Sequence, residues 1–242
     1  MRPWVWLPVG AWPFPFKALG KDSDALTPPW PELVISCGRR AVPYALAIKR
    51  RSKGRSFIAH IQDPRVDPAR FDLVIAPRHD KLRGANVLET LGSLSRLTRA
   101  ALDRAAAAWA PQLAKLPKPR VAVLIGGASR AYRLTPVIAL ALGKELSAFA
   151  QRAGVGLLVT TSRRTGAENE RALREGLAGA PFVEPRGQDS YAAILGLADA
   201  VIVTADSVNM LSEGLIAGRP LLIASLPGGR SRIEALQEAG LR

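Results

Sequence analysis

A chain of 242 residues is long enough for one large domain or two small ones. With 34 Lys and Arg against 20 Asp and Glu, its net charge of +14 attracts anions such as nucleotides, nucleic acid and acidic lipid headgroups, without choosing among them. The single cysteine, Cys37, excludes an internal disulfide framework, and two histidines leave no Cys/His spacing for zinc. The sequence therefore indicates an intracellular, cytoplasmic protein without a structural metal.

Residues 1–31 differ from the rest of the chain, because they hold four of the five tryptophans and seven of the 19 prolines. Prolines interrupt any regular helix there, and the segment has neither the apolar core of a signal peptide nor the ~20 apolar residues of a spanning helix. Aromatic rings beside Arg2 and Lys17 fit peripheral contact with an anionic inner membrane. The alternative is an arm that packs on the following domain.

The next region, residues 32–112, alternates between short apolar runs and helical patterns. We expect strands at 33–35, 57–61 and 73–75, with a helix after Gly38 that continues to about Lys49. An alanine-rich helix is expected from Leu91 to Ala110, and the prolines that follow indicate a hinge. This region is predicted to be an N-terminal Rossmann-like domain.

Polar residues follow the apolar runs of this first domain. Ligands of open α/β sheets bind outside the carboxyl ends of strands, which makes Asp63 and His79 site candidates by position. His79 is the only histidine placed to act as a base, whereas His60 lies within a strand and is expected to be packed. The basic cluster at 49–55 has no RNA-binding signature or interleaved aromatic residues, so nucleic acid is not the expected partner.

Residues 113–242 alternate more regularly, with apolar runs at 121–125, 155–160, 182–183, 201–203 and 221–223 separated by helical segments. A helix capped by Thr135 is expected to end at Gly154, and a last helix begins near Arg230. Five such units describe a doubly wound parallel sheet. The fold class is therefore α/β, with two Rossmann-like domains facing one cleft.

Two turns of the second domain contain residues suited to phosphate. Gly126 and Gly127 follow a strand and would let backbone N–H groups approach a phosphate, but the spacing lacks the G-x-G-x-x-G pattern of NAD sites, and no Walker lysine is present. Arg163 and Arg164 follow the next strand and suit a diphosphate, with two solvated arginines as the alternative. Thr165 and Glu168 have the spacing of a helix capping box.

The stretch from Ala200 to Ser225 predicts a strand, a polar loop, a short helix and another strand. The unsatisfied N–H groups at the helix N-terminus form an anion site, and Asp206 and Ser207 can cap the helix or contact a ligand beside it. Glu213 lies on the polar face of the helix and could reach a sugar hydroxyl. The alternative is that Ser207 only caps and Glu213 is a solvated surface residue.

Six runs together resemble a known family: SCGRR (36–40), IQDPR (61–65), APRHDKLRGANVL (76–88), IGGASRAYR (125–133), TTSRRT (160–165) and TADSVNMLSEGLIAGRP (204–220). They look like those of the bacterial relatives of the plant mitochondrial-fission "elongated mitochondria" family, over about residues 30–230. That family is similar in architecture to GT-B glycosyltransferases and nucleotide-sugar epimerases. Its members usually begin with a further glycine-containing strand and helix that form part of the acceptor side of the cleft, so the resemblance implies that the N-terminal domain here is an incomplete acceptor-side domain.

The resemblance implies a metal-independent hexosyltransferase-like or epimerase-like enzyme whose substrate is a nucleotide-diphosphate sugar, with no other cofactor. The residues it implies are Gly126, Gly127 and Ser129 lining the cleft, Ser207, Asn209 and Met210 meeting the diphosphate through backbone N–H groups, Glu213 on ribose, and His79 or Asp63 as the base for an acceptor hydroxyl. The second interpretation is a non-catalytic interaction protein of the fission family at a membrane surface.

Overall fold

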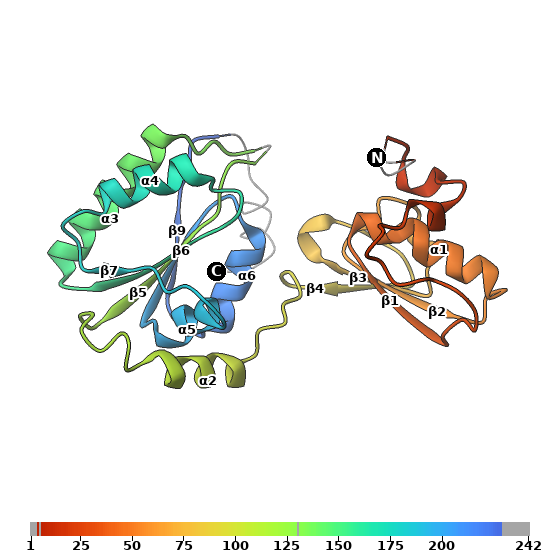
Figure 1. The fold of residues 1–242 in the computed structure, drawn as a ribbon, viewed down its shortest axis with the longest axis horizontal. Coiled ribbons are helices and arrows are strands. Elements are labelled where there is room, and N and C mark those ends of the chain that lie inside the picture. The colour runs from red at the N-terminus through yellow and green to blue at the C-terminus, as the bar shows by residue number, and fades with distance from the viewer. Residues whose placement is uncertain (1–3, 5, 130, 229–242) are drawn as a thin grey trace. The chain divides into compact units, whose positions relative to one another are not determined.

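The computed structural model describes residue 4, residues 6–129 and residues 131–228. The chain forms two compact units, divided between Gly92 and Ser93, and each unit contains one parallel β-sheet (Figure 1). The predicted α/β class with two Rossmann-like domains is confirmed. The helix expected near Arg230 lies outside the described residues.

The first unit contains a four-stranded sheet in the order β1-β2-β3-β4. Its elements are β1 (Leu33–Cys37), α1 (Val42–Arg51), β2 (Phe57–Ile61), β3 (Leu73–Pro77) and β4 (Val87–Thr90), with short 3-10 turns η1 (Val9–Ala11), η2 (Pro15–Ala18), η3 (Arg39–Ala41), η4 (Pro68–Arg70) and η5 (Arg78–Asp80). All neighbouring strands pair in parallel. Among the described residues, α1 is the one α-helix of this unit.

Helix α1 covers one face of this sheet. Leu46 of α1 belongs to the same buried cluster as Ile58 of β2 and Val74 of β3. His60 lies two residues after Ile58 on β2, and it therefore points to the same covered face. It is 0% exposed, its Nδ1 lies 2.8 Å from Ser36 Oγ, and its ring packs 5.1 Å from that of Phe71. His60 is a packed residue, as the sequence predicted.

The opposite face of the same sheet is apolar and open to solvent. The strand register places Leu33 beside Phe57, and Ile35 and Leu88 alternate onto this side of their own strands. All four side chains are exposed. Parallel sheets normally carry helices on both faces, so the first unit has one of its two layers among the residues described.

The Trp- and Pro-rich segment packs on the outer side of α1. Trp12 and Ala18 are buried. The Trp12 ring lies 6.0 Å from that of Tyr44 on α1, and the Tyr44 hydroxyl donates to the Ala18 carbonyl at 3.1 Å. The described part of residues 1–31 is therefore a packed arm, although Trp6 and Phe14 stay exposed on it.

The second unit contains a five-stranded sheet in the order β7-β6-β5-β8-β9. Its elements are α2 (Arg99–Trp109), β5 (Arg120–Ile125), α3 (Pro136–Ala153), β6 (Gly156–Thr161), α4 (Ala167–Gly176), β7 (Phe182–Val183), α5 (Ser190–Leu197), β8 (Ala200–Thr204), α6 (Val208–Ile216) and β9 (Leu221–Ala224). The order reverses on either side of β5, as it does in doubly wound sheets.

Helices cover both faces of this second sheet. Val123 and Val159 pack in one buried cluster with Leu146 of α3 and Leu173 of α4. Helix α5 contacts β5 and β6, α6 contacts β8, and α2 packs on α5 (Figure 1). The crossing of α2 and α5 is close, because a Cβ at Gly196 would meet the carbonyl oxygen of Leu102. The strands are therefore apolar on both sides.

The structure corrects two expectations about the boundary between the units. Helix α2 begins at Arg99, eight residues later than expected, and belongs to the second unit together with α5. The proline-containing stretch after it is not a hinge between units. Arg120, which is 5% exposed, donates from Nη2 to the carbonyls of Leu113 at 2.7 Å and Leu116 at 3.4 Å. These bonds fasten the stretch to the start of β5.

Candidate functional site

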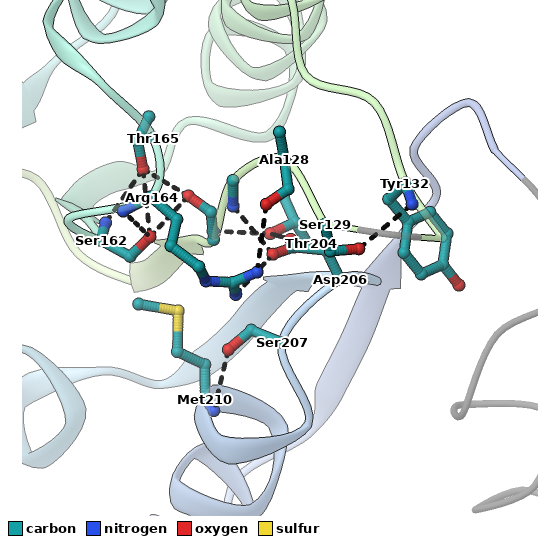
Figure 2. A network of polar contacts seen from close by, with 12 residues as sticks. Ala128, Ser129, Tyr132, Ser162, Arg164, Thr165, Thr204, Asp206, Ser207 and Met210 are labelled. Atoms are coloured by element: carbon teal, nitrogen blue, oxygen red, sulfur yellow. Dashed lines mark hydrogen bonds and ion pairs between the residues drawn. The ribbon is translucent and has the colours of Figure 1, made fainter. Parts of the chain in front are cut away.

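Three loops meet at the carboxyl ends of β5, β6 and β8. They are the segment after β5 (126–129), the turn after β6 (162–165) and the turn between β8 and α6 (204–207). Figure 2 shows the polar side chains and backbone groups of all three loops joined in one network. This edge of a doubly wound sheet, next to the strand where the order reverses, is where such folds bind ligands.

The carboxylate of Asp206 is the centre of this network. Its Oδ2 accepts from the backbone N–H of Gly127 and from Nη2 of Arg164, both at 2.8 Å. Its Oδ1 accepts from the hydroxyl of Thr204 at 2.7 Å. The side chain is 0% exposed. Because a buried charge is costly unless it is paired and hydrogen-bonded, these donors are what keeps a carboxylate here.

The two glycines have a different role from the predicted one. The N–H of Gly126 donates to the Thr204 hydroxyl and that of Gly127 to Asp206, each at 2.8 Å. Both N–H groups are thus already used inside the protein, which corrects the expectation that they approach a phosphate. A Cβ at Gly126 would clash with the Asp206 carboxylate, and one at Gly127 with the backbone of Arg164. Glycine is required because the loops touch.

Thr165 does not form the predicted capping box with Glu168. Helix α4 has Gly166 as its N-cap, without a side-chain cap. The buried Thr165 hydroxyl instead contacts the Gly126 carbonyl, and the Ser162 hydroxyl donates to that carbonyl at 2.8 Å. These bonds hold the turn after β6 against the loop after β5, and they place Arg164 beside Asp206.

The two predicted arginines differ in their surroundings. Arg163 is exposed. The guanidinium of Arg164 is paired with Asp206, contacts the Ala128 carbonyl at 3.4 Å, and is still 45% exposed. Figure 2 shows it reaching from the turn after β6 toward the start of α6. Arg164 is therefore a held cation with part of its surface open to solvent.

The N-terminus of α6 lies one residue beyond Asp206. The Ser207 hydroxyl accepts from the backbone N–H of Met210 at 3.4 Å, so Ser207 is the N-cap and the N–H of Met210 is used. Within the described chain, no acceptor contacts the backbone N–H groups of Val208 and Asn209. The helix start thus keeps two unsatisfied donors and the positive end of its dipole.

Glu213 is a half-buried residue with two partners in its own unit. Its Oε2 accepts from the Tyr191 hydroxyl of α5 at 2.8 Å, and its Oε1 from the Ser95 hydroxyl at 3.2 Å. The neighbouring Ser212 hydroxyl accepts from the N–H of Ser93 at 2.9 Å. Burial, followed by the charge of Glu213, raises the pKa of Tyr191, which therefore stays a donor. Glu213 is not the solvated residue of the alternative interpretation, and its contact with ribose stays a prediction.

Ser129 and the candidates of the first unit also have internal partners. The Ser129 hydroxyl accepts from the N–H groups of Ala131 and Tyr132, which shapes its turn. Asp63 pairs with Arg65 at 3.0 Å and its side chain is 15% exposed. The His79 side chain is 3% exposed, with Nε2 3.9 Å from Asp80. The role of Asp63 or His79 as a base stays a prediction.

The residues of these contacts that were not singled out from the sequence include Ser95, Ser162, Tyr191 and Thr204. Thr204 carried the one available signal, because a polar residue that ends an apolar strand often points to the strand edge. In the part of the chain that the structure describes, no group of three or more His, Cys, Asp or Glu residues could hold a metal ion. The helices described are all too short or too polar to cross a bilayer.

Comparison with known proteins agrees with the resemblance. The family model for mitochondrial fission ELM1 matches residues 1–240. The chain belongs to the mitochondrial fission ELM1 family. It is 32% identical over 235 residues to the mitochondrial fission protein ELM1 of Arabidopsis thaliana, covering 86% of this chain and 55% of that protein. It is 23% identical over 236 residues to an uncharacterized protein of Rickettsia prowazekii, covering 83% and 66% respectively.

This ELM1-family chain thus spans about half to two-thirds of the length of these relatives. Among solved structures it is similar to a putative UDP-N-acetylglucosamine 2-epimerase from Listeria monocytogenes, with a TM-score of 0.54 and 11% identity over 86% of this chain and 65% of that one. At this identity the likeness shows the fold alone. It confirms the GT-B-like, two-domain Rossmann-like architecture.

Proposed function

We propose that this ELM1-family chain binds a nucleoside-diphosphate sugar at the carboxyl edge of its five-stranded sheet, as part of a hexosyltransferase or a nucleotide-sugar epimerase. One observation carries the proposal: the partly exposed Arg164 guanidinium is paired with Asp206, the residue before the N-cap of α6, and among the described residues the first N–H groups of α6 have no acceptor. A guanidinium beside a helix N-terminus is suited to phosphate.

The fold supports the same assignment. The Listeria structure, which is named a putative UDP-N-acetylglucosamine 2-epimerase, shares the architecture. Such a site catalyses cleavage of the donor by stabilising the leaving diphosphate. Arg164 and the dipole of α6 supply positive charge for this. Glu213 is the proposed ribose ligand, and its oxygens can accept a second hydrogen bond each beside Tyr191 and Ser95. Asp63 or His79 is the proposed base for an acceptor.

The test is calorimetric titration with UDP and UDP-N-acetylglucosamine. We expect the wild type to bind UDP, and Arg164→Ala to weaken binding by about tenfold or more, because a charge-assisted hydrogen bond to phosphate is lost. Arg152→Ala is the matched control, since Arg152 is an exposed arginine of α3 and the change in net charge is the same. Absence of binding to any nucleoside diphosphate, or equal losses in both variants, would refute the proposal.

A second candidate function is attachment to an anionic membrane surface, alongside or instead of catalysis. Trp6 is 80% exposed and Phe14 is 57% exposed on the arm, although the rest of the arm is packed. Lys17 Nζ lies 5.2 Å from the Phe14 ring centroid, and Arg51 lies 4.4 Å from that of Phe16. Exposed aromatic rings beside cationic side chains suit the headgroup region of an anionic bilayer.

Vesicle co-sedimentation tests this candidate. Deleting residues 1–31 would uncover α1, so the double variant Trp6→Ser/Phe14→Ser is the cleaner change. We expect it to lower binding to phosphatidylglycerol vesicles at least fivefold, because each ring loses ~1.5 kcal/mol or more of apolar burial. Phe57→Ser, at an exposed ring of the sheet, serves as the control. Wild-type protein that stays in the supernatant would exclude a membrane surface as the partner.

A further inference from the structure

The sequence suggested that Asp206 contacts a ligand, but its carboxylate is directed inward. Three donors from three different loops converge on its two oxygens: the Gly127 N–H, the Thr204 hydroxyl and the Arg164 guanidinium, at 2.8, 2.7 and 2.8 Å. No part of the side chain is exposed to solvent. A carboxylate in this position does not meet a bound phosphate. It acts on the groups that surround it.

Of the three groups that donate to Asp206, Arg164 is the one that stays partly exposed to solvent. The Gly127 N–H and the Thr204 hydroxyl are buried, whereas the Arg164 side chain is 45% exposed. A guanidinium has five N–H donors in a fixed plane. Nη2 donates to Asp206, Nη1 contacts Ala128, and Nε has no acceptor among the described residues. The side chain is held in place and can still bind an anion.

The ion pair also fixes where that anion can lie. Asp206 directly precedes Ser207, the N-cap of α6, so the Arg164 guanidinium is held next to the helix start. The free N–H groups of Val208 and Asn209 can take one phosphate, and Arg164 beside them can take the next. A side chain already held in its bound conformation loses less conformational entropy when the ligand arrives.

We propose that Asp206 is a positioning residue that holds Arg164 for the second phosphate of the ligand, so that the site selects nucleoside diphosphates over monophosphates. This inference rests on the proposed function, because it assumes that the ligand at this edge is a nucleotide. It assigns to Asp206 and Arg164 together the discrimination between UDP and UMP.

The experiment measures the affinities of UDP and UMP by calorimetry in the wild type, Asp206→Asn, Arg164→Ala and the double variant. Asparagine has the shape of aspartate but lacks the charge and one acceptor oxygen. We expect Asp206→Asn to weaken UDP binding about tenfold and UMP binding less than about twofold. The double variant should lose no more than Arg164→Ala alone, because both changes remove the same interaction.

A control separates positioning from general loosening of the loops. Thr204→Val removes the hydroxyl that contacts Asp206 Oδ1 and leaves the pair between Oδ2 and Arg164 intact. We expect this variant to keep the wild-type ratio of UDP to UMP affinity even where its melting temperature falls. If Asp206→Asn does not fold, Arg164→Lys is the second variant, since lysine keeps the charge but lacks the planar fork, and the ratio should then fall.

The outcomes distinguish this inference from the function on which it rests. Wild-type protein that binds neither UDP nor any other nucleoside diphosphate refutes both. UDP binding with an unchanged ratio of UDP to UMP affinity in Asp206→Asn refutes the inference alone, as do equal losses for the two nucleotides, which indicate a structural role. Tighter UDP binding in Asp206→Asn also refutes it, because Asp206 would then compete with the ligand for Arg164.

Discussion

The first unit should lose on the order of 3 kcal/mol of stability between about pH 7 and pH 4, because His60 is buried in its neutral form. Burial lowers the pKa of His60 from 6.5 to about 4, with the charge of Asp63 acting in the opposite direction. In the unfolded chain the imidazole takes up a proton near pH 6.5, whereas in the folded unit it does so only near pH 4. The contribution of neutral His60 to stability is therefore fully present above about pH 7, and it is lost as the pH falls from about 7 to about 4.

Urea unfolding followed by tryptophan fluorescence measures this effect in the right unit, since Trp4, Trp6, Trp12 and Trp30 all belong to the first unit and only Trp109 to the second. His60→Gln keeps a polar partner for Ser36 and should flatten the dependence. An equal slope in wild type and His60→Gln would show that another group is responsible.

Asp72 does not confuse this measurement. Burial favours a higher pKa for Asp72, but hydrogen bonds from Lys49 and from the N–H of Ile58 outweigh it and hold the pKa below its usual 3.8. A carboxylate with a lowered pKa contributes stability above its unfolded pKa and loses it as the pH falls further. The contribution of Asp72 is therefore lost at more acid pH than that of His60.

Gly127→Ala should destabilise the second unit by about 3 kcal/mol, the upper part of the usual range for overpacking. The added Cβ would meet the carbonyl group of Arg164 and the backbone N of Thr165, and backbone atoms cannot rotate away as a side chain can. The turn after β6 must then move off the loop after β5, which separates Arg164 from Asp206. Loss of UDP binding should accompany the loss of stability.

Thermal melting followed by circular dichroism should show this as a decrease in Tm of roughly 6–12 °C. Ala128→Ser, at the next position of the same loop but on an exposed side chain, should stay within ~0.5 kcal/mol of the wild type. A Gly127→Ala protein with wild-type Tm would mean that the loops are not in the close contact described here.

Local patterns in the sequence predicted the elements that have local causes. Thr135 was expected to cap a helix that ends at Gly154, and α3 runs from Pro136 to Ala153, with the Thr135 side chain accepting from Ile138 and Gly154 in the left-handed conformation. Capping and glycine reversal involve residues only a few positions apart. All strands except β4 (Val87–Thr90) were predicted for the same reason, since each is a short apolar run followed by a turn.

The roles of the site residues depend on partners far along the chain, and these could not be predicted. Thr165 has the spacing of a capping box, but its hydroxyl contacts Gly126, 39 residues earlier. Asp206 was placed correctly at a helix start, yet nothing in the sequence indicates that its carboxylate turns toward Gly127, 79 residues away. Glu213 was assigned to a polar helix face, while its partner Ser95 lies 118 residues away. The places of these residues on their helices and turns could be predicted, but the directions of their side chains could not.

The open side of the four-stranded sheet changes how substitutions in the first unit should be weighed. Ile58 and Ile35 are both strand isoleucines, but Ile58 is 0% exposed beneath α1 and Ile35 is 66% exposed on the other side. Truncating Ile58 removes packing that the fold depends on, at a cost of about 2–5 kcal/mol. At Ile35 there is little packing to remove, so replacing this isoleucine by threonine or serine should leave the free energy of unfolding of this unit almost unchanged.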